Sequence, residues 1–395
     1  MNILSDISFL SICTGCGLCA NICSNNAISM QVDDEGFLSP HIEIEKCNEC
    51  GDCLKCCPLL SKSECASRQP IEVYACQIFD KKLLIDATAG GLFPLLAQCI
   101  LDQNGVVYGA AYDNNMKVVH CAAYNMEGVK RFSGSKYVQS DASKTFGEIK
   151  ELLKKDKKVL FSGTPCQVDA VIRYCDYSEL TNLYTVDVVC YGVPSPKLFR
   201  MYLDTVEKQY NRKIIDFSFR DKHSNGWSHT TVIQMQDSKG NVTILEEPDY
   251  SKIPYYRMFG CRDCYRRSCY HCKYNKVSRI SDITTGNFWG IEKLSASFET
   301  KLGVSMALIN TDKGKNIFSS IQSKMIVEKR TLDEAIQANE ALVNVSSYPP
   351  KRDRIYACLN KHGFSEVIKR YYSTNWYRKL RNKLSTTKNK IFKKW

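Results

Sequence analysis

Eight cysteines near the N-terminus stand in two groups of four that share one spacing. Each group reads Cys-x2-Cys-x2-Cys-x3-Cys, and the second group repeats the first 34 residues further along the chain. The eight positions are Cys13, Cys16, Cys19, Cys23, Cys47, Cys50, Cys53 and Cys57. Three thiolates at this spacing wrap one face of a cubane iron–sulfur cluster, and the fourth reaches across to a second cluster. The repeat therefore predicts a ferredoxin-type domain with two [4Fe–4S] clusters.

The two clusters are expected to exchange their last ligands. Cys57, which ends the second group, completes the first cluster, and Cys23 completes the second. Gly17 and Gly51 follow the second cysteine of each group and let the backbone turn tightly toward the inorganic sulfides. A zinc site or disulfides are the alternatives, but zinc usually takes two separated cysteine pairs rather than a repeated quartet. Cys56 has no place in this ligand set and is interpreted as a small buried thiol.

A second constellation of cysteines lies in the segment CRDCYRRSCYHC, residues 261–272. Its two Cys-x2-Cys pairs could form a small zinc loop by themselves. Two further cysteines follow buried strands, Cys166 in FSGTPCQ and Cys190 in DVVCYG. Because the carboxyl ends of strands line the sites of open α/β sheets, both could converge with Cys269 and Cys272 on a third cubane. A buried core thiol is the alternative for Cys166 or Cys190 alone.

Other candidate residues carry weaker signals. The segment TAGG, residues 88–91, stands directly before an apolar segment, 92–101, that is typical of a helix. A glycine pair at a helix start lets a phosphate or a flat ring approach the backbone N–H groups, although an ordinary tight turn is the simpler explanation. Lys136 in GSKYVQS could face a flavin, or it could be a solvated lysine. The remaining isolated candidates, each with a structural role as the alternative, are Asp187, His120 and His271.

The remaining sequence alternates strand-like and helix-like segments, which is typical of an α/β domain. Strands are expected at 106–113, 157–163, 183–190 and 303–311 and as three short runs within 213–247, and helices at 92–101, 146–155, 196–210, 313–325 and 332–342. Ser195 and Pro196 are typical of a helix start. We therefore expect an α+β ferredoxin-like domain over 1–62, a larger α/β domain with a mixed sheet over 63–345, and a basic helical tail over 346–395.

Composition favours a redox protein of a reducing compartment. With 395 residues and a hydrophobic fraction of 44%, the chain can build two or three domains with sizeable cores. The first residues lack the basic segment of a signal peptide, and no apolar stretch is long enough to span a membrane. The 21 cysteines of such a chain indicate metal and redox sites rather than disulfides. The expected location is the cytoplasm.

The net charge is concentrated at the C-terminus. Residues 351–395 carry 14 Lys and Arg and 2 acidic residues, a surplus that equals the net charge of +12 of the whole chain. Within 366–395, basic residues alternate with aromatic ones, and Trp376, Leu380 and Leu384 fall on one helical face. Such a helix could lie on an anionic membrane at its inner face, or it could dock on the protein itself. Nucleic acid is not expected as a partner, because no recognition motif accompanies the charge.

Seven motifs in order resemble the coenzyme F420 hydrogenase/dehydrogenase beta-subunit family. They are TAGG, VVYGAAYD, GSKYVQS, LFSGTPCQ, DVVCYGVPSP, RRSCYHC and SDITTGNFWG. The resemblance covers about residues 10–345 and points to the bacterial branch with a fused ferredoxin domain, often encoded with polysaccharide-biosynthesis genes. In that family the α/β domain binds FAD beside a [4Fe–4S] cluster. The resemblance implies that the flavin lies at Ala89, Gly90, Gly91 and Lys136 and the cluster on Cys166, Cys190, Cys269 and Cys272.

The chain departs from the family pattern at three places. Ala89 stands where the family usually has serine, which removes a hydroxyl group near the flavin. Tyr191 replaces the usual histidine, a possible proton donor, and Asn287 replaces the usual aspartate. None of these changes touches an implied cluster ligand. They bear on flavin affinity and on protonation of a substrate.

The resemblance implies an iron–sulfur flavoprotein oxidoreductase. A redox donor, such as ferredoxin or a reductase, would reduce the N-terminal clusters, and electrons would pass through the third cluster to FAD, which joins one-electron to two-electron chemistry. One alternative is an electron-transfer subunit that docks on a separate catalytic partner protein, and another is a zinc-stabilised interaction module. Use of F420 depends on the organism, and a role in polysaccharide biosynthesis rests on family association alone. The sequence assigns neither a substrate nor catalytic residues.

Overall fold

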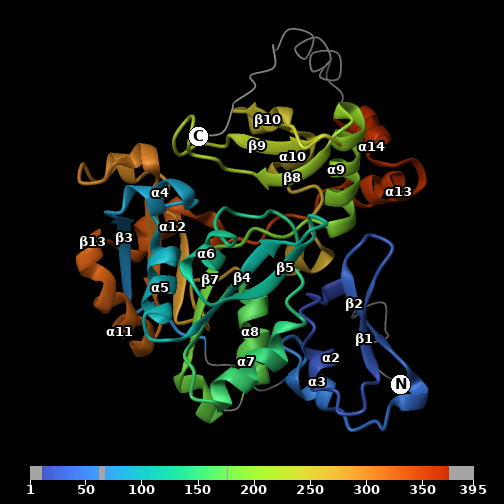
Figure 1. Cartoon of the computed structure of the whole chain (residues 1–395). Coiled ribbons are helices and arrows are strands. Elements are labelled where there is room, and N and C mark those ends of the chain that lie inside the picture. The colour runs from blue at the N-terminus through green and yellow to red at the C-terminus, as the bar shows by residue number, and fades with distance from the viewer. Residues whose placement is uncertain (1–10, 62–66, 176, 373–395) are drawn as a thin grey trace.

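The computed structural model describes residues 11–61, 67–175 and 177–372 (Figure 1). The chain forms a small N-terminal domain, a larger α/β body around an eight-stranded sheet, and a three-stranded sheet that lies over one end of the body. The mixed sheet and the small N-terminal domain confirm this part of the predicted fold class.

The N-terminal domain repeats a loop that carries three cysteines and a one-turn helix. Its elements are α2 (Leu18–Ile22), β1 (Ile28–Val32), β2 (Leu38–Ile42), η2 (Ile44–Lys46) and α3 (Asp52–Cys56). Gly17 and Gly51 precede the two helices with φ of 82° and 75°, a left-handed conformation that glycine adopts readily. This confirms the predicted tight turns. Among the described residues, the domain's own hydrophobic cluster contains two buried members, Cys13 and Ile28, so apolar packing between these residues holds it weakly.

The eight-stranded sheet has the order β13-β3-β12-β11-β7-β6-β4-β5. Its strands are β3 (Glu72–Ile78), β4 (Val106–Tyr112), β5 (Val118–Ala123), β6 (Val159–Gly163), β7 (Leu183–Val188), β11 (Ile283–Asn287), β12 (Ser305–Ile309) and β13 (Met325–Lys329). The central strands β11, β7, β6 and β4 are parallel, and the outer strands pair antiparallel. The carboxyl ends of the parallel strands therefore meet at one edge, where sheets of this kind place their sites.

Helices cover both faces of this sheet. They are α4 (Lys81–Asp86), α5 (Leu92–Leu101), α6 (Met126–Lys130), α7 (Thr145–Lys154), α8 (Pro165–Tyr174), α11 (Asp312–Ile321) and α12 (Leu332–Ala338), with the short turns η3 (Tyr177–Thr181), η6 (Ile291–Lys293), η7 (Thr300–Leu302), η8 (Gln322–Lys324) and η9 (Glu340–Leu342). Leu160 of β6 packs with α5 and α11, whereas its neighbours Val159 and Phe161 pack with α7 and α8. This alternation is expected for a strand buried on both faces.

The second sheet is antiparallel, with the order β10-β9-β8, and it packs on four helices. These elements are β8 (Lys213–Ser218), β9 (Thr231–Gln236), β10 (Val242–Glu247), α9 (Pro196–Tyr210), α10 (Pro254–Gly260), α13 (Arg352–His362) and α14 (Phe364–Tyr371), with the turns η4 (Tyr250–Lys252) and η5 (Arg267–His271). The predicted start of α9 is confirmed, because the Ser195 hydroxyl accepts a hydrogen bond from the Leu198 amide.

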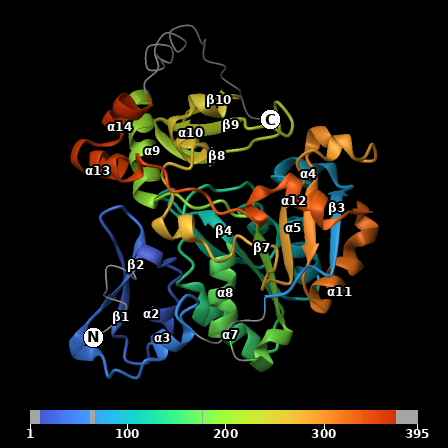
Figure 2. The same cartoon turned by 180° about the vertical axis from the view of Figure 1, so that it is seen from behind.

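The N-terminal domain docks beside α7 and α8 in both views (Figures 1 and 2). Leu18 of α2 is fully buried in the cluster that α7 and α8 form with the sheet. The tip of the β1–β2 hairpin is held by the buried Arg352 of α13, whose guanidinium donates to both carboxylate oxygens of Glu35, at 2.8 and 2.5 Å. Lys197 donates to the backbone oxygen of Asp34 at 2.9 Å. The small domain is thus joined to the body by both apolar and ionic contacts.

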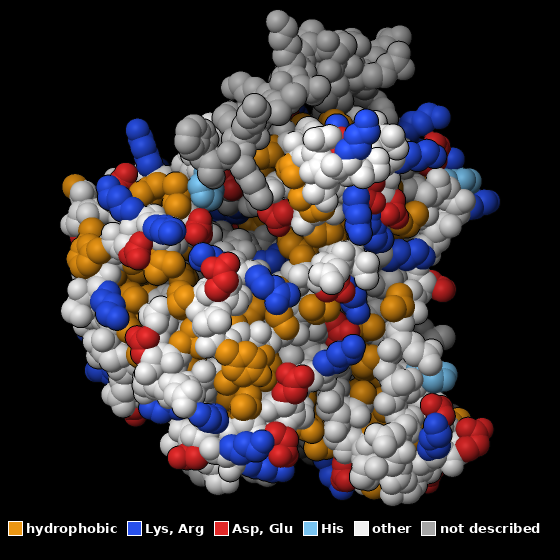
Figure 3. All heavy atoms as spheres, in the orientation of Figure 1, with side chains coloured by type: hydrophobic (Ala, Val, Ile, Leu, Met, Phe, Trp, Pro, Cys, Tyr) orange, Lys and Arg blue, Asp and Glu red, His pale blue; other side chains and the backbone are white. Residues whose placement is uncertain are grey.

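The described part of the C-terminal segment packs on the body. Val367 and Ile368 of α14 are buried in the same cluster as α9. Residues 373–395 lie outside the described residues, so the predicted amphipathic face of Trp376, Leu380 and Leu384 does too. Among the described helices, none is both long and apolar enough to cross a membrane. The face shown in Figure 3 intersperses basic and acidic side chains.

Candidate functional site

The N-terminal cysteines lie in two sets. One hollow of this domain is lined by Cys13, Cys16, Cys19 and Cys57. Burial raises the pKa of the Cys53 thiol, and three neighbouring thiols raise it further. These neighbours are Cys50, Cys47 and Cys23. Each set thus joins three cysteines of one repeat to the last cysteine of the other.

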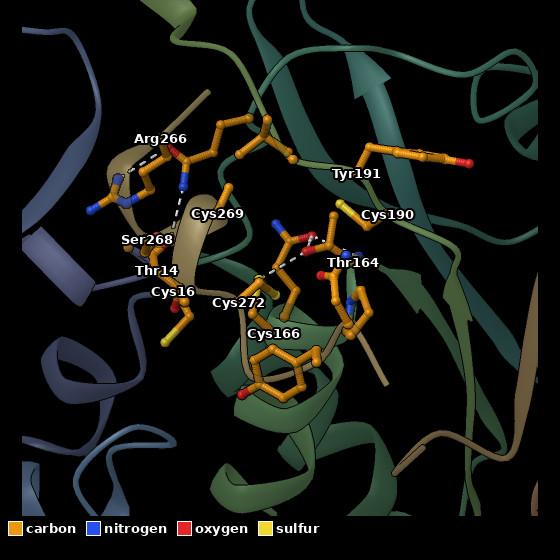
Figure 4. A pocket seen from close by; sticks show the side chains of 18 of the residues that line it. Thr14, Cys16, Thr164, Cys166, Cys190, Tyr191, Arg266, Ser268, Cys269 and Cys272 are labelled. Atoms are coloured by element: carbon orange, nitrogen blue, oxygen red, sulfur yellow. Dashed lines mark hydrogen bonds between the residues drawn. The ribbon is translucent and has the colours of Figure 1, made fainter. Parts of the chain in front are cut away.

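A further hollow lies between the N-terminal domain and the carboxyl edge of the large sheet (Figure 4). The cysteines that line it are Cys16, Cys166, Cys190, Cys269 and Cys272. Burial raises the pKa of the Cys190 thiol, and the neighbouring thiols of Cys269, Cys166 and Cys272 raise it further. Within the described chain, no three His, Cys, Asp or Glu side chains are close enough to hold a single metal ion. The thiols therefore surround an open space rather than one point.

Local structure explains how these cysteines reach the hollow. Cys166 lies in the first turn of α8, where the Thr164 hydroxyl is 3.1 Å from its sulfur and caps the helix. Cys190 follows β7 by two residues, so both cysteines lie at carboxyl ends of parallel strands, as the sequence predicted. Cys269 is held by η5, and its amide donates to the Arg266 carbonyl at 2.9 Å. The η5 turn thus carries its cysteine across to the sheet edge.

The first pair of the 261–272 segment does not join this group. Cys261 is exposed, whereas Cys264 is fully buried in the aromatic cluster around the second sheet. The Cys264 carbonyl accepts a hydrogen bond from the Tyr356 hydroxyl at 2.7 Å. Neither thiol lines the hollow of Cys269 and its partners. The alternative of a local zinc loop built from both Cys-x2-Cys pairs is therefore not formed by these side chains.

Arg266 lies between the two cysteine-lined hollows and was not singled out by the sequence. It is 4% exposed, and its Nε donates to the Cys13 carbonyl at 2.6 Å. Its Nη1 donates to the Gln139 side chain at 3.3 Å. A side chain on Gly15 would come within 2.8 Å of the guanidinium, so glycine permits the close approach. A buried cation therefore stands beside cysteines of both domains.

A large cavity of about 500 Å³ opens at the same edge of the sheet, within the size range of small-molecule sites. Among the residues implied for flavin, Ala89, Gly91 and Lys136 line it. Gly90 faces the sheet instead, because a side chain there would collide with the backbone of Cys76 and Ser305. The glycine pair therefore has two roles: one member lets α5 start beside the cavity, and the other permits close packing on β3 and β12.

The polar lining of the cavity is basic or neutral. Its ionisable cations are Lys136 and Arg220, and no described residue that lines it is Asp or Glu. Burial lowers the pKa of Lys136 to about 8, while its ammonium donates to three backbone carbonyls of the 131–134 loop. Burial also lowers the pKa values of His120 and His229 to about 4, so both imidazoles are neutral at pH 7. This lining suits an anionic ligand.

Lys222 positions one wall of the cavity and was also missed by the sequence analysis. It is 3% exposed, and its ammonium donates to the carbonyls of Leu84, Ala89 and Leu302. Burial lowers its pKa to about 7. Three carbonyls around one buried lysine fix the loop that precedes α5. Lys222 stands in no recognisable motif, so the sequence did not indicate that it would fix this loop.

The remaining sequence candidates have different positions. Tyr191 and Asn287, two of the departures from the family pattern, both line the large cavity, and the Tyr191 ring extends away from the cysteines (Figure 4). The Asn287 side-chain oxygen is buried and has no partner among the described residues. His271 is exposed. Asp187 lies fully buried in β7, where its carboxylate is 3.6 Å from the Arg279 guanidinium, so it forms a structural ion pair.

Two family models match the chain. The one described as "4Fe-4S dicluster domain" matches residues 12–59, and the one for the C terminus of the beta subunit of coenzyme F420 hydrogenase/dehydrogenase matches residues 156–335. Residues 156–335 thus match the C-terminal region of the coenzyme F420 hydrogenase/dehydrogenase beta-subunit family, and the two matches support this family with an N-terminal ferredoxin domain. Binding of [4Fe–4S] clusters and electron transfer within an oxidoreductase follow from the same two matches.

Solved structures give a more distant likeness. One, described as a xenon derivatization of the F420-reducing [NiFe] hydrogenase complex from Methanosarcina barkeri, shares 18% identity with this chain. The likeness covers 82% of this chain and 96% of that chain, with a TM-score of 0.45. The chain has no match among curated proteins.

The three hollows form a series with shared walls. Thr14, Gly15 and Cys16 line both the hollow inside the ferredoxin domain and the hollow between the domains. The latter shares seven lining residues with the large cavity, namely Ser140, Thr164, Gln167, Cys190, Tyr191, Gly192 and Val193. One cysteine, Cys16, thus separates the first pair of hollows, and another, Cys190, separates the second pair.

Proposed function

We propose that this protein is an iron–sulfur flavoprotein oxidoreductase that passes electrons from a redox donor, such as ferredoxin or a reductase, to a substrate in the large cavity. The series of three hollows supports this proposal above all else. Because one cysteine stands in each shared wall, Cys16 and Cys190 would each belong to a cluster and face the next centre. Short spacing between redox centres is what electron transfer along a chain of cofactors requires.

The residues assigned to the clusters are the twelve cysteines in three sets. The proposed sets are Cys13, Cys16, Cys19 and Cys57; Cys47, Cys50, Cys53 and Cys23; and Cys166, Cys190, Cys269 and Cys272. Burial disfavours thiolates in the third set, as the raised pKa values of Cys166 and Cys269, to about 12 and about 11, indicate. Bound iron supplies the positive charge that makes ligating thiolates stable there. Cys50 of the second set is exposed, which suits electron uptake from a donor.

The large cavity is the proposed FAD site. Its volume, the buried Lys136 ammonium and the Asn287 side-chain oxygen, which has no partner among the described residues, fit a large anionic cofactor with polar ring edges. Gly91 precedes α5 in the left-handed conformation, φ 83°. The amides of Leu92 and Phe93 make no backbone hydrogen bond among the described residues and are available to a pyrophosphate beside Lys136. When bound, the flavin would convert single electrons from the clusters into two-electron chemistry. F420 remains a second possible occupant of the same basic cavity.

A pure electron-transfer subunit is the second candidate function. The family name, which describes a beta subunit, favours it, because such a subunit works with a separate catalytic partner protein. Under this alternative the clusters are retained and the large cavity holds no flavin. A cytoplasmic location and a substrate from polysaccharide biosynthesis complete the proposal. Contact of the tail with an anionic membrane is a further part of it and concerns residues outside those described.

Metal and flavin analysis of one anaerobic sample tests the proposal. The full-length protein is expected to contain about 12 iron and about 12 sulfide per chain, from three cubanes, and one FAD. Clusters without flavin would support the electron-transfer subunit instead. Zinc at this stoichiometry without sulfide would contradict both candidates.

A matched pair of variants tests the third set of ligands. Cys269→Ala should lower the iron content from about 12 to about 8 per chain and slow flavin reduction by an external donor. Cys261→Ala changes an exposed cysteine eight residues earlier and should leave the iron content unchanged. Equal loss in the two variants would favour a local four-cysteine site and would rule out the proposed set.

A further inference from the structure

A cluster of aromatic rings lies in the wall of the large cavity, apart from the residues assigned to the clusters and to the flavin. The indole rings of Trp227 and Trp289 stack with their centroids 4.4 Å apart and their planes at 24°. On the cavity wall, the His229 ring lies nearly parallel to Trp289, with the centroids 5.9 Å apart. Trp289 is 37% exposed. The structure therefore presents flat ring surface toward the cavity.

Arg220 lies against these rings and keeps an unused donor. It is 5% exposed, and its guanidinium carbon is 5.0 Å from the centre of Trp289 and 5.5 Å from that of Trp227. Its Nε donates to the Ser228 carbonyl at 3.1 Å, which fixes the plane of the group. Its Nη2 is buried and has no hydrogen-bond partner within the described residues. A buried guanidinium with an unmade hydrogen bond is costly unless a ligand completes it.

Nothing else in the described lining of the cavity neutralises this cation. No carboxylate of the described residues lines the cavity, and the nearby imidazole of His229 hydrogen-bonds the Tyr256 hydroxyl at 2.9 Å. Arg220 follows β8, whereas Gly91 and Lys136 belong to the start of α5 and to the 133–138 loop. Arg220, the cation of the aromatic cluster, therefore comes from a different segment of the chain than Lys136, the cation proposed to hold the flavin.

We propose that Arg220, Trp289 and His229 form the substrate subsite of the cavity and that it takes a planar ring carrying a carboxylate or phosphate group. The anionic group completes the hydrogen bonding of Arg220, and the ring packs against the exposed part of the Trp289 side chain. Arginine suits this role because its planar fork matches such oxyanions and stacks on aromatic rings. The inference rests on the proposed function, since it assigns the remaining part of the same cavity.

Benzoate, a planar carboxylate, tests the subsite in the full-length protein loaded with iron and flavin. Binding is followed by quenching of tryptophan fluorescence and by the flavin absorption spectrum. Benzoate is expected to bind at least about tenfold more tightly than benzamide, which lacks the charge, or acetate, which lacks the ring. Equal binding of the three probes, or no binding of any, would overturn the proposal.

Two variants assign the effect to residues. Arg220→Gln should remove the preference for benzoate over benzamide and leave the iron and flavin contents unchanged. Trp289→Leu should instead remove the preference over acetate, and it tests the subsite independently if the first variant does not fold. The matched control is Arg212→Gln, which changes an arginine paired with Asp237 at the far hairpin, 3.0 Å away, and should bind as the wild type does.

The result also separates this inference from the proposed function. If Arg220→Gln loses flavin, Arg220 belongs to the cofactor site and the subsite proposal is wrong while the flavoprotein proposal stands. If the wild type carries no flavin but still prefers benzoate through Arg220, the subsite stands and the flavoprotein proposal fails.

Discussion

The ferredoxin domain and the α/β body assemble their cysteines in opposite ways. In the ferredoxin domain eight cysteines lie in two copies of a short repeat, and among the described residues its own hydrophobic cluster buries Cys13 and Ile28 alone. In the body four cysteines come from three distant segments, and an eight-stranded sheet with helices on both faces brings them to one edge. The clusters would therefore be the core of the first region, whereas the second region has a core without them.

This difference predicts opposite responses to the loss of one ligand. Cys57→Ala should remove about four iron per chain and abolish the hydrogen-exchange protection of residues 11–61, because the domain lacks an apolar core of its own. Cys269→Ala should remove as much iron and leave the protection of the large sheet intact. Cys56→Ala, which changes the neighbouring thiol, should affect neither quantity. If Cys57→Ala leaves the small domain protected, the contrast between the two regions is wrong.

A buried guanidinium contributes an ion pair to the contact between the two regions. Arg352→Met removes a guanidinium with no exposed surface that binds both oxygens of Glu35, and it should lower the free energy of unfolding by about 3 kcal/mol. The free energy is measured by denaturant unfolding, and hydrogen-exchange protection of the β1–β2 hairpin reports on this contact. Arg267→Met, which removes a 43% exposed contact to the same carboxylate, should cost less than about 1 kcal/mol. Equal effects would show that burial does not decide the strength of this contact.

A smaller effect is expected where the regions share a cation. Arg266 stands beside Cys13 and lines the hollow of Cys166 and Cys269, so its positive charge should favour the reduced, more negative state of the adjoining clusters. Arg266→Gln should lower their reduction potentials by about 60 mV, a tenfold change for one electron. Arg267→Gln should shift them much less, because solvent screens its charge. Redox titration followed by electron paramagnetic resonance measures both, and unchanged potentials in Arg266→Gln would exclude this coupling.

The smallest predicted effect is a pH dependence of the cavity. Burial lowers the pKa of Lys136 to about 8, with nearby Asp216 acting in the opposite direction. Backbone carbonyls take the three N–H groups of the protonated lysine, so its charge attracts the anion, and affinity for FAD is full below this pKa and falls as the pH rises through it. Affinity should fall about tenfold from pH 7 to pH 9, because the protonated fraction falls by that factor. In Lys136→Met the affinity should be lower and should not vary over this range; a persistent dependence would assign it to another group.

Local patterns in the sequence were enough to predict much of the secondary structure. The helix from Pro196 to Tyr210 was predicted, because the Ser195 cap and Pro196 that mark its start act within a few residues. The expected strands at 106–113, 157–163 and 183–190 are confirmed as β4, β6 and β7. Four strands of the large sheet, β3, β5, β11 and β13, were not predicted. Of these, β3 and β13 pair across more than 200 positions, which local patterns do not encode.

The cysteine sites likewise differ in how much of their assembly local sequence patterns predict. Spacing by itself predicted the N-terminal cysteine sets, because three ligands of each proposed cluster stand a few residues apart and the repeat supplies the fourth, Cys57 or Cys23. The gathering of Cys166, Cys190, Cys269 and Cys272 around one hollow was decided by the tertiary structure, because the sheet order and the η5 turn bring distant segments together. Arg266, Lys222 and Arg220 had no sequence signal for the same reason. Their roles come from burial among partners that only the folded chain supplies.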